Sequence, residues 1–278
     1  MRGTDRGVVL GLYRSAPTRE LIETARDLGV VGIDTAFNYQ RFNSHRHLAH
    51  VAGDLLDDFT ISTKVGFFPG SDPAACALHS LDPRRLREAV EQSAESLGRV
   101  PDVVFLHSPE RSLTGRAPEE ALDAACITLA DAQRAGLCRA WGIATWDPRS
   151  LITAPPPTLP SVLLLRSGLS VAHPILTACE RLIELCDLPA TNVWGMSPFG
   201  GDAREAAWQE VDLTDFTPAS APNTDIAFRV AYDLPPVTRV AVGTTNRDHL
   251  RSLVAATNLP IIPEAVTTYR GLTREHDR

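Results

Sequence analysis

Short apolar runs alternate along this chain with longer segments in which apolar residues recur every three or four positions. The short runs are apolar at nearly every position, which is typical of strands buried on both faces of a parallel sheet. The longer segments have the spacing of amphipathic helices. The pattern predicts strands at residues 7–13, 30–34, 59–64, 102–107, 138–144, 161–167, 191–197 and 238–243.

Capping residues mark where the helices begin. Thr18 and Ser44 each precede a periodic segment and can cap it, and Asp82 is followed by Pro83 at the first helical position. The stretch from Pro260 to the C-terminus is expected to be a tail. Further helices are expected at residues 118–135, 147–154, 171–185, 226–232 and 246–255, with a short one around Ala206.

Eight strands, each followed by helical sequence, form the pattern of a (β/α)8 barrel at its usual length. We therefore predict an α/β protein in which residues 1–278 form one barrel domain, with no interdomain linker. The alternative is a doubly wound open sheet, which usually has Gly-x-Gly-x-x-Gly after its first strand. Residues 7–11, Gly-Val-Val-Leu-Gly, lack that fingerprint.

Composition narrows the partners. The chain is 44% hydrophobic with a net charge of −7, which argues against nucleic acid or an anionic membrane as partner. No apolar run approaches the ~18 residues of a membrane span, and no apolar signal core follows Met1. The expected setting is the cytoplasm. The cysteines suggest buried thiols, because they are odd in number and never spaced Cys-x-x-Cys: Cys76, Cys126, Cys138, Cys179 and Cys186.

Ionisable residues end three consecutive predicted strands. These residues are Asp34, Lys64 and His107, and Tyr39 lies in the loop after the second strand. Taken singly, they could be a helix cap, a surface lysine, a core histidine and a surface tyrosine. In a barrel, however, the carboxyl ends of the strands converge on the face that carries active sites. The four side chains are therefore predicted to share one quarter of the barrel mouth.

The chemistry of these four groups is coherent. The Tyr39 phenol has an ordinary pKa of ~10, and the Lys64 ammonium is expected to lower it. Asp34 would keep Lys64 charged, and a neutral His107 could orient a carbonyl oxygen. Such a set can protonate an oxygen as hydride arrives at carbon, and the hydride must come from a cofactor. A lyase or cyclase could use the same set for proton transfer without redox change.

Several motifs then resemble the aldo-keto reductase family. They are Asp-Thr-Ala-x-x-Tyr at residues 34–39, Ser-Thr-Lys-Val at 62–65, Phe-Leu-His at 105–107, Ser-Pro-Phe at 197–199 and Val-Gly-Thr-Thr-Asn at 242–246 with His249-Leu250. The resemblance implies a (β/α)8 barrel that binds NADPH in extended form and reduces a small-molecule carbonyl substrate. The catalytic set it implies is Asp34, Tyr39, Lys64 and His107.

The positions that would bind the cofactor depart from the family pattern. Ala144 and Thr145 align where the family commonly has Ser-Asn, and Leu164 aligns with a glutamine. Losing two or three such amide contacts at ~1 kcal/mol each would weaken binding tens-fold or more. A non-catalytic binding subunit stays open as an alternative, because some relatives of this fold resemble reductases yet serve as accessory subunits. The cofactor-binding residues that the resemblance implies are Ala144, Thr145, Leu164, Ser197, Pro198, Phe199, Gly200, Gly243, Thr244, Thr245, Arg247 and His249.

Other candidates carry weaker signals. His45, His47 and His50 do not share one helical face and have no completing acid, so they predict a solvated helix start and no metal site. Phe67, Phe68 and Trp146 follow strand ends and could wall an apolar pocket, whereas Trp194 is expected in the barrel core.

Overall fold

A computed structural model describes residues 6–70, 77–113, 117–153, 155–205 and 207–276. Its centre is a closed barrel of eight parallel strands in the order β1-β10-β9-β8-β7-β6-β3-β2, so the predicted (β/α)8 fold is confirmed. Each predicted strand overlaps one of the barrel strands. These are β1 (Gly7–Gly11), β2 (Gly32–Asp34), β3 (Thr60–Val65), β6 (Val103–His107), β7 (Ala140–Thr145), β8 (Val162–Arg166), β9 (Val193–Met196) and β10 (Arg239–Val242).

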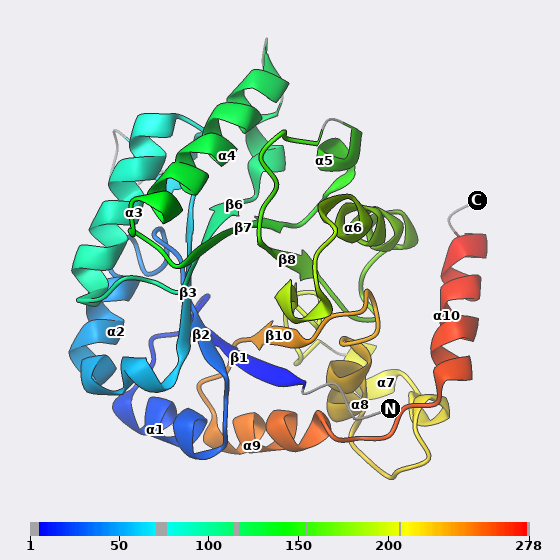
Figure 1. Cartoon of the computed structure of the whole chain (residues 1–278). Helices are drawn as coiled ribbons and strands as arrows, with labels where there is room; N and C mark the ends of the chain where they lie inside the picture. The colour runs from blue at the N-terminus through cyan, green and yellow to red at the C-terminus, as the bar shows by residue number, and fades with distance from the viewer. Residues whose placement is uncertain (1–5, 71–76, 114–116, 154, 206, 277–278) are drawn as a thin grey trace.

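Helices surround the strands (Figure 1). Short 3₁₀ helices lie in the connections among the strands and helices: η1 (Gly53–Asp58), η2 (Pro109–Ser112), η3 (Ala190–Asn192) and η4 (Thr214–Phe216). The residue around which one short helix was predicted, Ala206, lies outside the described residues, and a short helix begins at the next residue. The α-helices are α1 (Arg19–Asp27), α2 (Ser44–Ala52), α3 (Pro83–Leu97), α4 (Pro118–Arg134), α5 (Arg149–Thr153), α6 (His173–Cys186), α7 (Ala207–Glu210), α8 (Asn223–Val230), α9 (Arg247–Ala256) and α10 (Pro263–His276).

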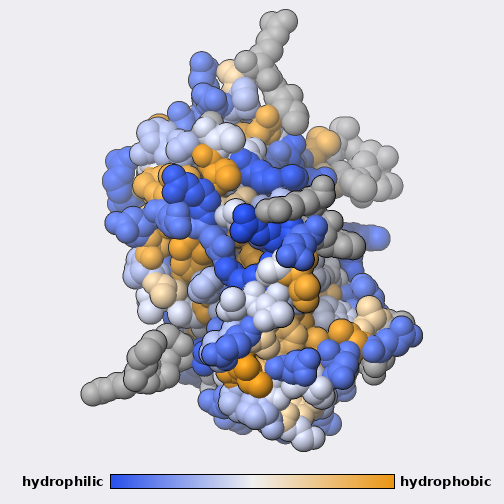
Figure 2. All heavy atoms as spheres, turned by 90° about the vertical axis from the view of Figure 1, so that its right-hand side faces the viewer, coloured by the Kyte–Doolittle hydropathy of each residue, from blue (hydrophilic) through white to orange (hydrophobic). Residues whose placement is uncertain are grey.

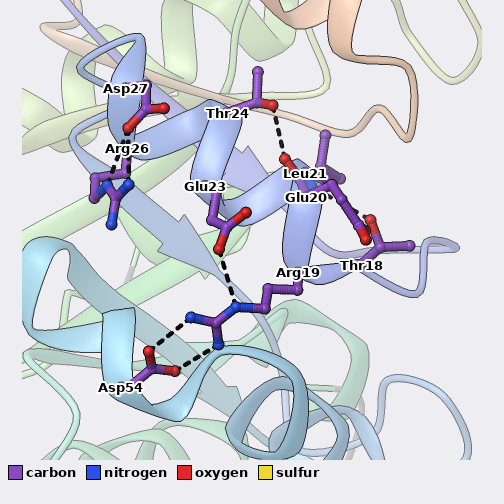
Figure 3. Close-up of polar contacts among 9 residues, drawn as sticks. All are labelled: Thr18, Arg19, Glu20, Leu21, Glu23, Thr24, Arg26, Asp27 and Asp54. Atoms are coloured by element: carbon purple, nitrogen blue, oxygen red, sulfur yellow. Dashed lines mark hydrogen bonds and ion pairs between the residues drawn. The ribbon is translucent and has the colours of Figure 1, made fainter.

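The predicted cap of α1 is present. The Thr18 hydroxyl accepts from the Leu21 amide at 3.3 Å, as Figure 3 shows. On the outer face of the helix, the Arg19 guanidinium donates to both carboxylate oxygens of Asp54 at 2.8 Å and to Glu23 at 3.0 Å. These groups are exposed, so the ion pairs contribute modestly while tying α1 to η1.

The predicted cap of α3 is also present, but that of α2 is different. Asp82 accepts from the Arg85 amide at 2.9 Å and precedes Pro83. In α2, Asn43 holds the cap position and Ser44 is already helical. The buried Ser44 hydroxyl instead bonds the Thr35 hydroxyl at 2.8 Å, so it fastens the helix to the segment just after β2.

Two apolar layers hold the barrel together. The larger one lies between the strands and the helices, and a smaller one fills the barrel interior. In the interior, the rings of Phe105 and Trp194 meet edge to face, 5.7 Å between centroids, which confirms Trp194 as core. Gly142 makes room for this pair, because a Cβ there would lie 2.8 Å from the Phe105 ring.

Two elements differ from the prediction. The loop after β3 contains a two-stranded antiparallel hairpin, β4 (Phe67–Phe68) with β5 (Leu78–His79). The expected C-terminal tail is wrong, because residues 263–276 form α10 (red in Figure 1). Tyr269 on this helix donates its hydroxyl hydrogen to the Leu169 carbonyl, and Arg270 pairs with Glu180 on α6.

The face that carries α10 mixes apolar and polar side chains (Figure 2). The described part of the chain contains no helix with the length and apolar character needed to cross a bilayer. Four of the cysteines predicted to be buried thiols are buried and unpaired, and Cys76 lies outside the described residues. The four are Cys126, Cys138, Cys179 and Cys186.

Candidate active site

The barrel mouth brings the four predicted side chains together. Strands β2, β3 and β6 are neighbours in the barrel, so Asp34, Lys64 and His107 project from adjacent strand ends. Tyr39, from the turn after β2, reaches the same place with its ring 6.3 Å from the His107 ring. The geometry expected from the sequence is therefore present.

Asp34 and Lys64 form a buried ion pair, with side chains only 7% and 3% exposed. The Lys64 ammonium also donates to the Thr35 carbonyl at 2.9 Å, and the second Asp34 oxygen accepts from the Ser62 hydroxyl at 2.8 Å. Burial lowers the pKa of Lys64, but the attraction of Asp34 and Tyr39 outweighs it and raises the pKa above its ordinary value. Lys64 is therefore a permanent cation.

Tyr39 lies against this cation. The Lys64 ammonium donates toward the Tyr39 hydroxyl oxygen at 3.4 Å, which leaves the phenol's own hydrogen free to be donated elsewhere. Burial raises the pKa of Tyr39, and the opposing effect of Lys64 is smaller. Lys64 does lower the pKa of Tyr39, as expected, but removal from water is the larger influence and the pKa lies above its ordinary value. At neutral pH the phenol keeps its proton.

His107 is neutral. Burial, followed by the charge of Lys64, holds its pKa well below the ordinary value of 6.5. Its Nδ1 is buried and has no hydrogen-bond partner among the described residues. The Phe67 ring packs edge-on at 4.8 Å, so the imidazole is walled on one side by apolar surface. A neutral imidazole has one N–H to donate and one nitrogen to accept.

The β4–β5 hairpin supports His107 through a residue that the sequence did not single out. The Nε2 of His79 lies 2.7 Å from the His107 carbonyl oxygen, and its Nδ1 lies 2.6 Å from the Ser112 hydroxyl. Because a carbonyl only accepts, Nε2 carries the hydrogen. Gly66 has φ of +144°, and a Cβ there would crowd both histidines.

His45 contradicts the expected solvated helix start. It is buried, and its Nε2 bonds the Thr63 hydroxyl at 2.7 Å. His47 points instead to the Pro17 carbonyl at 3.0 Å, and His50 is exposed. Among the residues that the structure describes, no group of three His, Cys, Asp or Glu side chains has a geometry that would hold a metal ion.

His45 gives a pH prediction. Burial lowers its pKa from 6.5 to about 4, so the unfolded chain takes up a proton that the folded chain refuses between these values. The contribution of His45 to the free energy of unfolding is therefore fully present above pH 6.5. It falls by about 3 kcal/mol as the pH drops to 4, at ~1.4 kcal/mol per pH unit. Chemical denaturation of His45→Gln should show a shallower pH dependence than the parent. Exposed His50→Gln, on the same helix, is the control and should keep the parent's slope.

The residues aligned with nicotinamide contacts lie along β7 and β8. Ala144 and Leu164 belong to the barrel interior and are 1% and 0% exposed. The buried Thr145 hydroxyl donates to Glu110 at 3.0 Å, and the Trp146 amide donates to the same carboxylate at 2.9 Å. Burial raises the pKa of Glu110, and the Trp146 amide opposes this. Glu110, not predicted from the sequence, thus links the ends of β6 and β7.

The loop after β9 is shaped from within. Ser197 and Gly200 have φ of 56° and 74°, which bends the chain sharply. The Phe199 ring stacks on Phe228 at 6.4 Å, and its carbonyl accepts from the Trp208 indole at 3.2 Å. Pro198 is buried, so the side chains of Pro198 and Phe199 anchor the loop in the core.

The side chain of Asn246 caps the start of α9. Asn246 accepts from the amides of Asp248 and His249 at 2.8 and 3.3 Å. The Thr244 hydroxyl accepts from the Asn246 amide at 3.1 Å. The remaining predicted positions in this region are all solvent-accessible: Gly243, Thr245, Arg247 and His249.

The three aromatic residues predicted to line one pocket lie in different places. Phe67 lies over His107, and Trp146 is 41% exposed beside the mouth. Phe68 is buried in the layer between strands and helices, where Arg85 covers its ring at 4.3 Å, so it does not face the mouth.

A model of the aldo/keto reductase family matches residues 13–187, which is more than half of the chain. The chain belongs to this family of oxidoreductases. The matched segment holds all four residues of the Asp34–Tyr39–Lys64–His107 cluster and ends before the loops that follow β9 and β10. "Pyridoxine 4-dehydrogenase" of Escherichia coli (strain K12) is 28% identical over 258 residues, 92% of this chain and 86% of that protein.

Solved aldo-keto reductases share the fold. One from Bacillus halodurans, in its holo form, gives a TM-score of 0.73 at 16% identity and covers 97% of this chain and 91% of that one. One from Klebsiella pneumoniae, in complex with NADP and acetate, gives 0.70 at 17% identity, covering 96% and 91%. At these identities the likeness is one of fold.

Proposed function

We propose that this protein is an NADPH-dependent reductase of a small carbonyl compound, with Tyr39 as its general acid. The supporting observation is the protonated phenol between a buried ammonium and a neutral imidazole. The His107 N–H would hold the carbonyl oxygen, and Tyr39 would donate its proton to that oxygen. When bound, the nicotinamide supplies the hydride.

The chain's own residues divide this work. Asp34 keeps Lys64 charged and in place, so the ammonium stabilises the Tyr39 phenolate that remains after proton donation. Phe67 shields His107 from water, which strengthens both hydrogen bonds to the substrate oxygen. The name of the Escherichia coli relative describes dehydrogenation of pyridoxine. For this chain we propose the substrate class only.

The residues at the mouth suit the flat nicotinamide ring, but they offer few hydrogen-bonding groups for its carboxamide. Leu164, Ala144 and Trp194 give the interior beneath the mouth an apolar surface for a flat ring. The Thr145 hydroxyl is already used by Glu110, so it offers little to the amide. Cofactor affinity would then depend on the loops after β9 and β10.

The phosphate end of the cofactor would rely on side chains. Since Asn246 already accepts from two amides at the start of α9, the exposed Arg247 and His249 are the available donors. A cationic contact there would favour NADPH, because only NADPH carries the 2'-phosphate. Replacing both residues with alanine should raise the NADPH dissociation constant about tenfold and that of NADH little, at ~1.5 kcal/mol for charged hydrogen bonds.

Fluorescence titration with both nucleotides measures this effect. Arg251→Ala is the control, because Arg251 lies one turn further along α9 and already pairs with Asp248. An equal rise for NADPH and NADH would contradict a 2'-phosphate contact.

A proton-transfer lyase or cyclase is the second candidate. The lack of a polar side chain for the nicotinamide amide at Ala144 and Leu164 favours it. Calorimetry separates the two proposals: the reductase requires a heat of binding with NADPH or NADH below millimolar ligand. Without that heat, proton transfer by the same four residues is the better account.

A further inference from the structure

Arg166 lies at the rim of the barrel mouth and has no role in the chemistry above. It is the last residue of β8, two positions after Leu164, whose side chain fills the barrel interior. Alternate residues of a strand share a face, so Arg166 leaves the sheet on the inner side. Strand β7 alone separates β8 from β6, and His107 is in register with Leu164, so Arg166 lies two strands and two residues from His107, ~12 Å along the sheet.

The Arg166 guanidinium has spare hydrogen-bond donors. One nitrogen donates to the Ser170 carbonyl at 3.3 Å, and the group lies over the Trp146 ring, 5.2 Å from its centroid. Its Nε is buried, with no hydrogen-bond partner among the described residues. A guanidinium has five N–H donors, so most of this fork is uncommitted.

Among the described residues, no carboxylate is close enough to Arg166 to form an ion pair with it. The acid closest along the rim is Asp147, and Arg149 holds it through both oxygens at 2.6–3.1 Å. Glu110 accepts from the neutral Thr145 hydroxyl and Trp146 amide and forms no ion pair with Arg166. At the mouth Asp34 and Lys64 cancel, and His107 is neutral. Arg166 therefore adds a positive charge that forms no ion pair among the described residues, and Arg111, over the Phe67 ring at 5.5 Å, adds a second on the side of His107.

Two other features hold the guanidinium at this rim. The Tyr269 hydroxyl of α10 donates to the Leu169 carbonyl, which fixes the loop whose next residue, Ser170, accepts from Arg166. The Trp146 ring, 41% exposed, presents a flat apolar wall beside it. A planar cation next to an aromatic wall suits a planar acid carried on an apolar body.

We propose that Arg166 binds an anionic group of the carbonyl substrate, a carboxylate or a phosphate, several bonds from the carbonyl carbon. This inference rests on the reductase function proposed above. It makes the preferred substrates aldehydes or ketones with a negatively charged tail. Tyr39 and His107 act on the carbonyl, and Arg166 with Trp146 receives the other end.

The test compares substrates that differ only in charge. With NADPH saturating, kcat/KM is measured for 4-carboxybenzaldehyde against 4-methylbenzaldehyde, and for glyceraldehyde 3-phosphate against glyceraldehyde. The first pair tests a carboxylate and the second a phosphate. We expect the parent to favour the anionic member of at least one pair by tenfold or more, mainly through KM.

Two variants assign this preference to Arg166. Arg166→Gln should abolish it by lowering kcat/KM for the anionic substrate ten- to hundredfold and leaving the neutral partner within twofold. Arg166→Lys should restore part of it, because the charge remains while the fork is lost. The NADPH dissociation constant, measured by fluorescence, should be unchanged in both variants.

The outcomes are distinct. A parent without charge preference in either pair overturns the proposal, as does equal loss for both members of a pair with weaker NADPH binding, which would assign Arg166 to the cofactor. If the parent reduces no aldehyde, the reductase function fails separately, and calorimetry with benzoate and inorganic phosphate decides the anion site. Heat of binding in the parent that is lost in Arg166→Gln supports the site without activity. No heat with either ion overturns it.

Discussion

Tyr39→Phe should lower turnover by 10²-fold or more, because it removes the proton that the proposed mechanism transfers. Phenylalanine keeps the ring that packs 5.3 Å from Tyr13 and 6.3 Å from His107, so the local structure should be preserved. The phenol is protonated at neutral pH, since burial raises its pKa. The loss should therefore appear in kcat over the whole neutral range, with NADPH affinity unchanged.

Tyr13→Phe is the matched control for this experiment. It makes the same chemical change on the neighbouring ring, which is 56% exposed and has no contact with Lys64 among those described. Its turnover should stay within a few-fold of the parent. Full activity in Tyr39→Phe would assign the proton to another donor and remove the main support for the proposed mechanism.

The placement of Asp34, Lys64 and His107 could be predicted because strand ends follow from periodicity. An apolar run that stops at an ionisable residue locates both the strand and its carboxyl end, and the barrel topology then gathers those ends. The net pKa of Tyr39 could not be predicted, since it depends on how much water the folded barrel excludes. Burial by distant segments leaves no local pattern.

Other parts of the site left weaker signals. His79 sits in a two-residue strand, too short to show alternation, and meets His107 across 28 residues of chain. Arg166 could have been found by counting two positions from Leu164, because alternate residues of a strand share a face. Helix α10 was missed because its apolar positions are sparse and it contains Gly271, a poor helix former.

Asp34→Ala should destabilise the fold by ~3–5 kcal/mol, because it leaves Lys64 as an unpaired buried cation. The ammonium would keep only the Thr35 carbonyl and the Tyr39 oxygen as partners. Ser62 would also lose the acceptor of its hydroxyl hydrogen. Chemical denaturation at neutral pH measures the change, and activity should fall too, since Lys64 would tend to lose its proton.

Two further variants separate charge from shape. Asp34→Asn keeps an oxygen for Ser62 but removes the negative charge, so it should recover only part of the loss. Asp34→Ala combined with Lys64→Met removes both charges, and it should be more stable than Asp34→Ala alone because no buried cation remains unpaired. If Asp34→Ala unfolds at the parent's denaturant concentration, Asp34 is not what keeps Lys64 charged. The roles proposed for Lys64 and Tyr39 would then need another source of that charge.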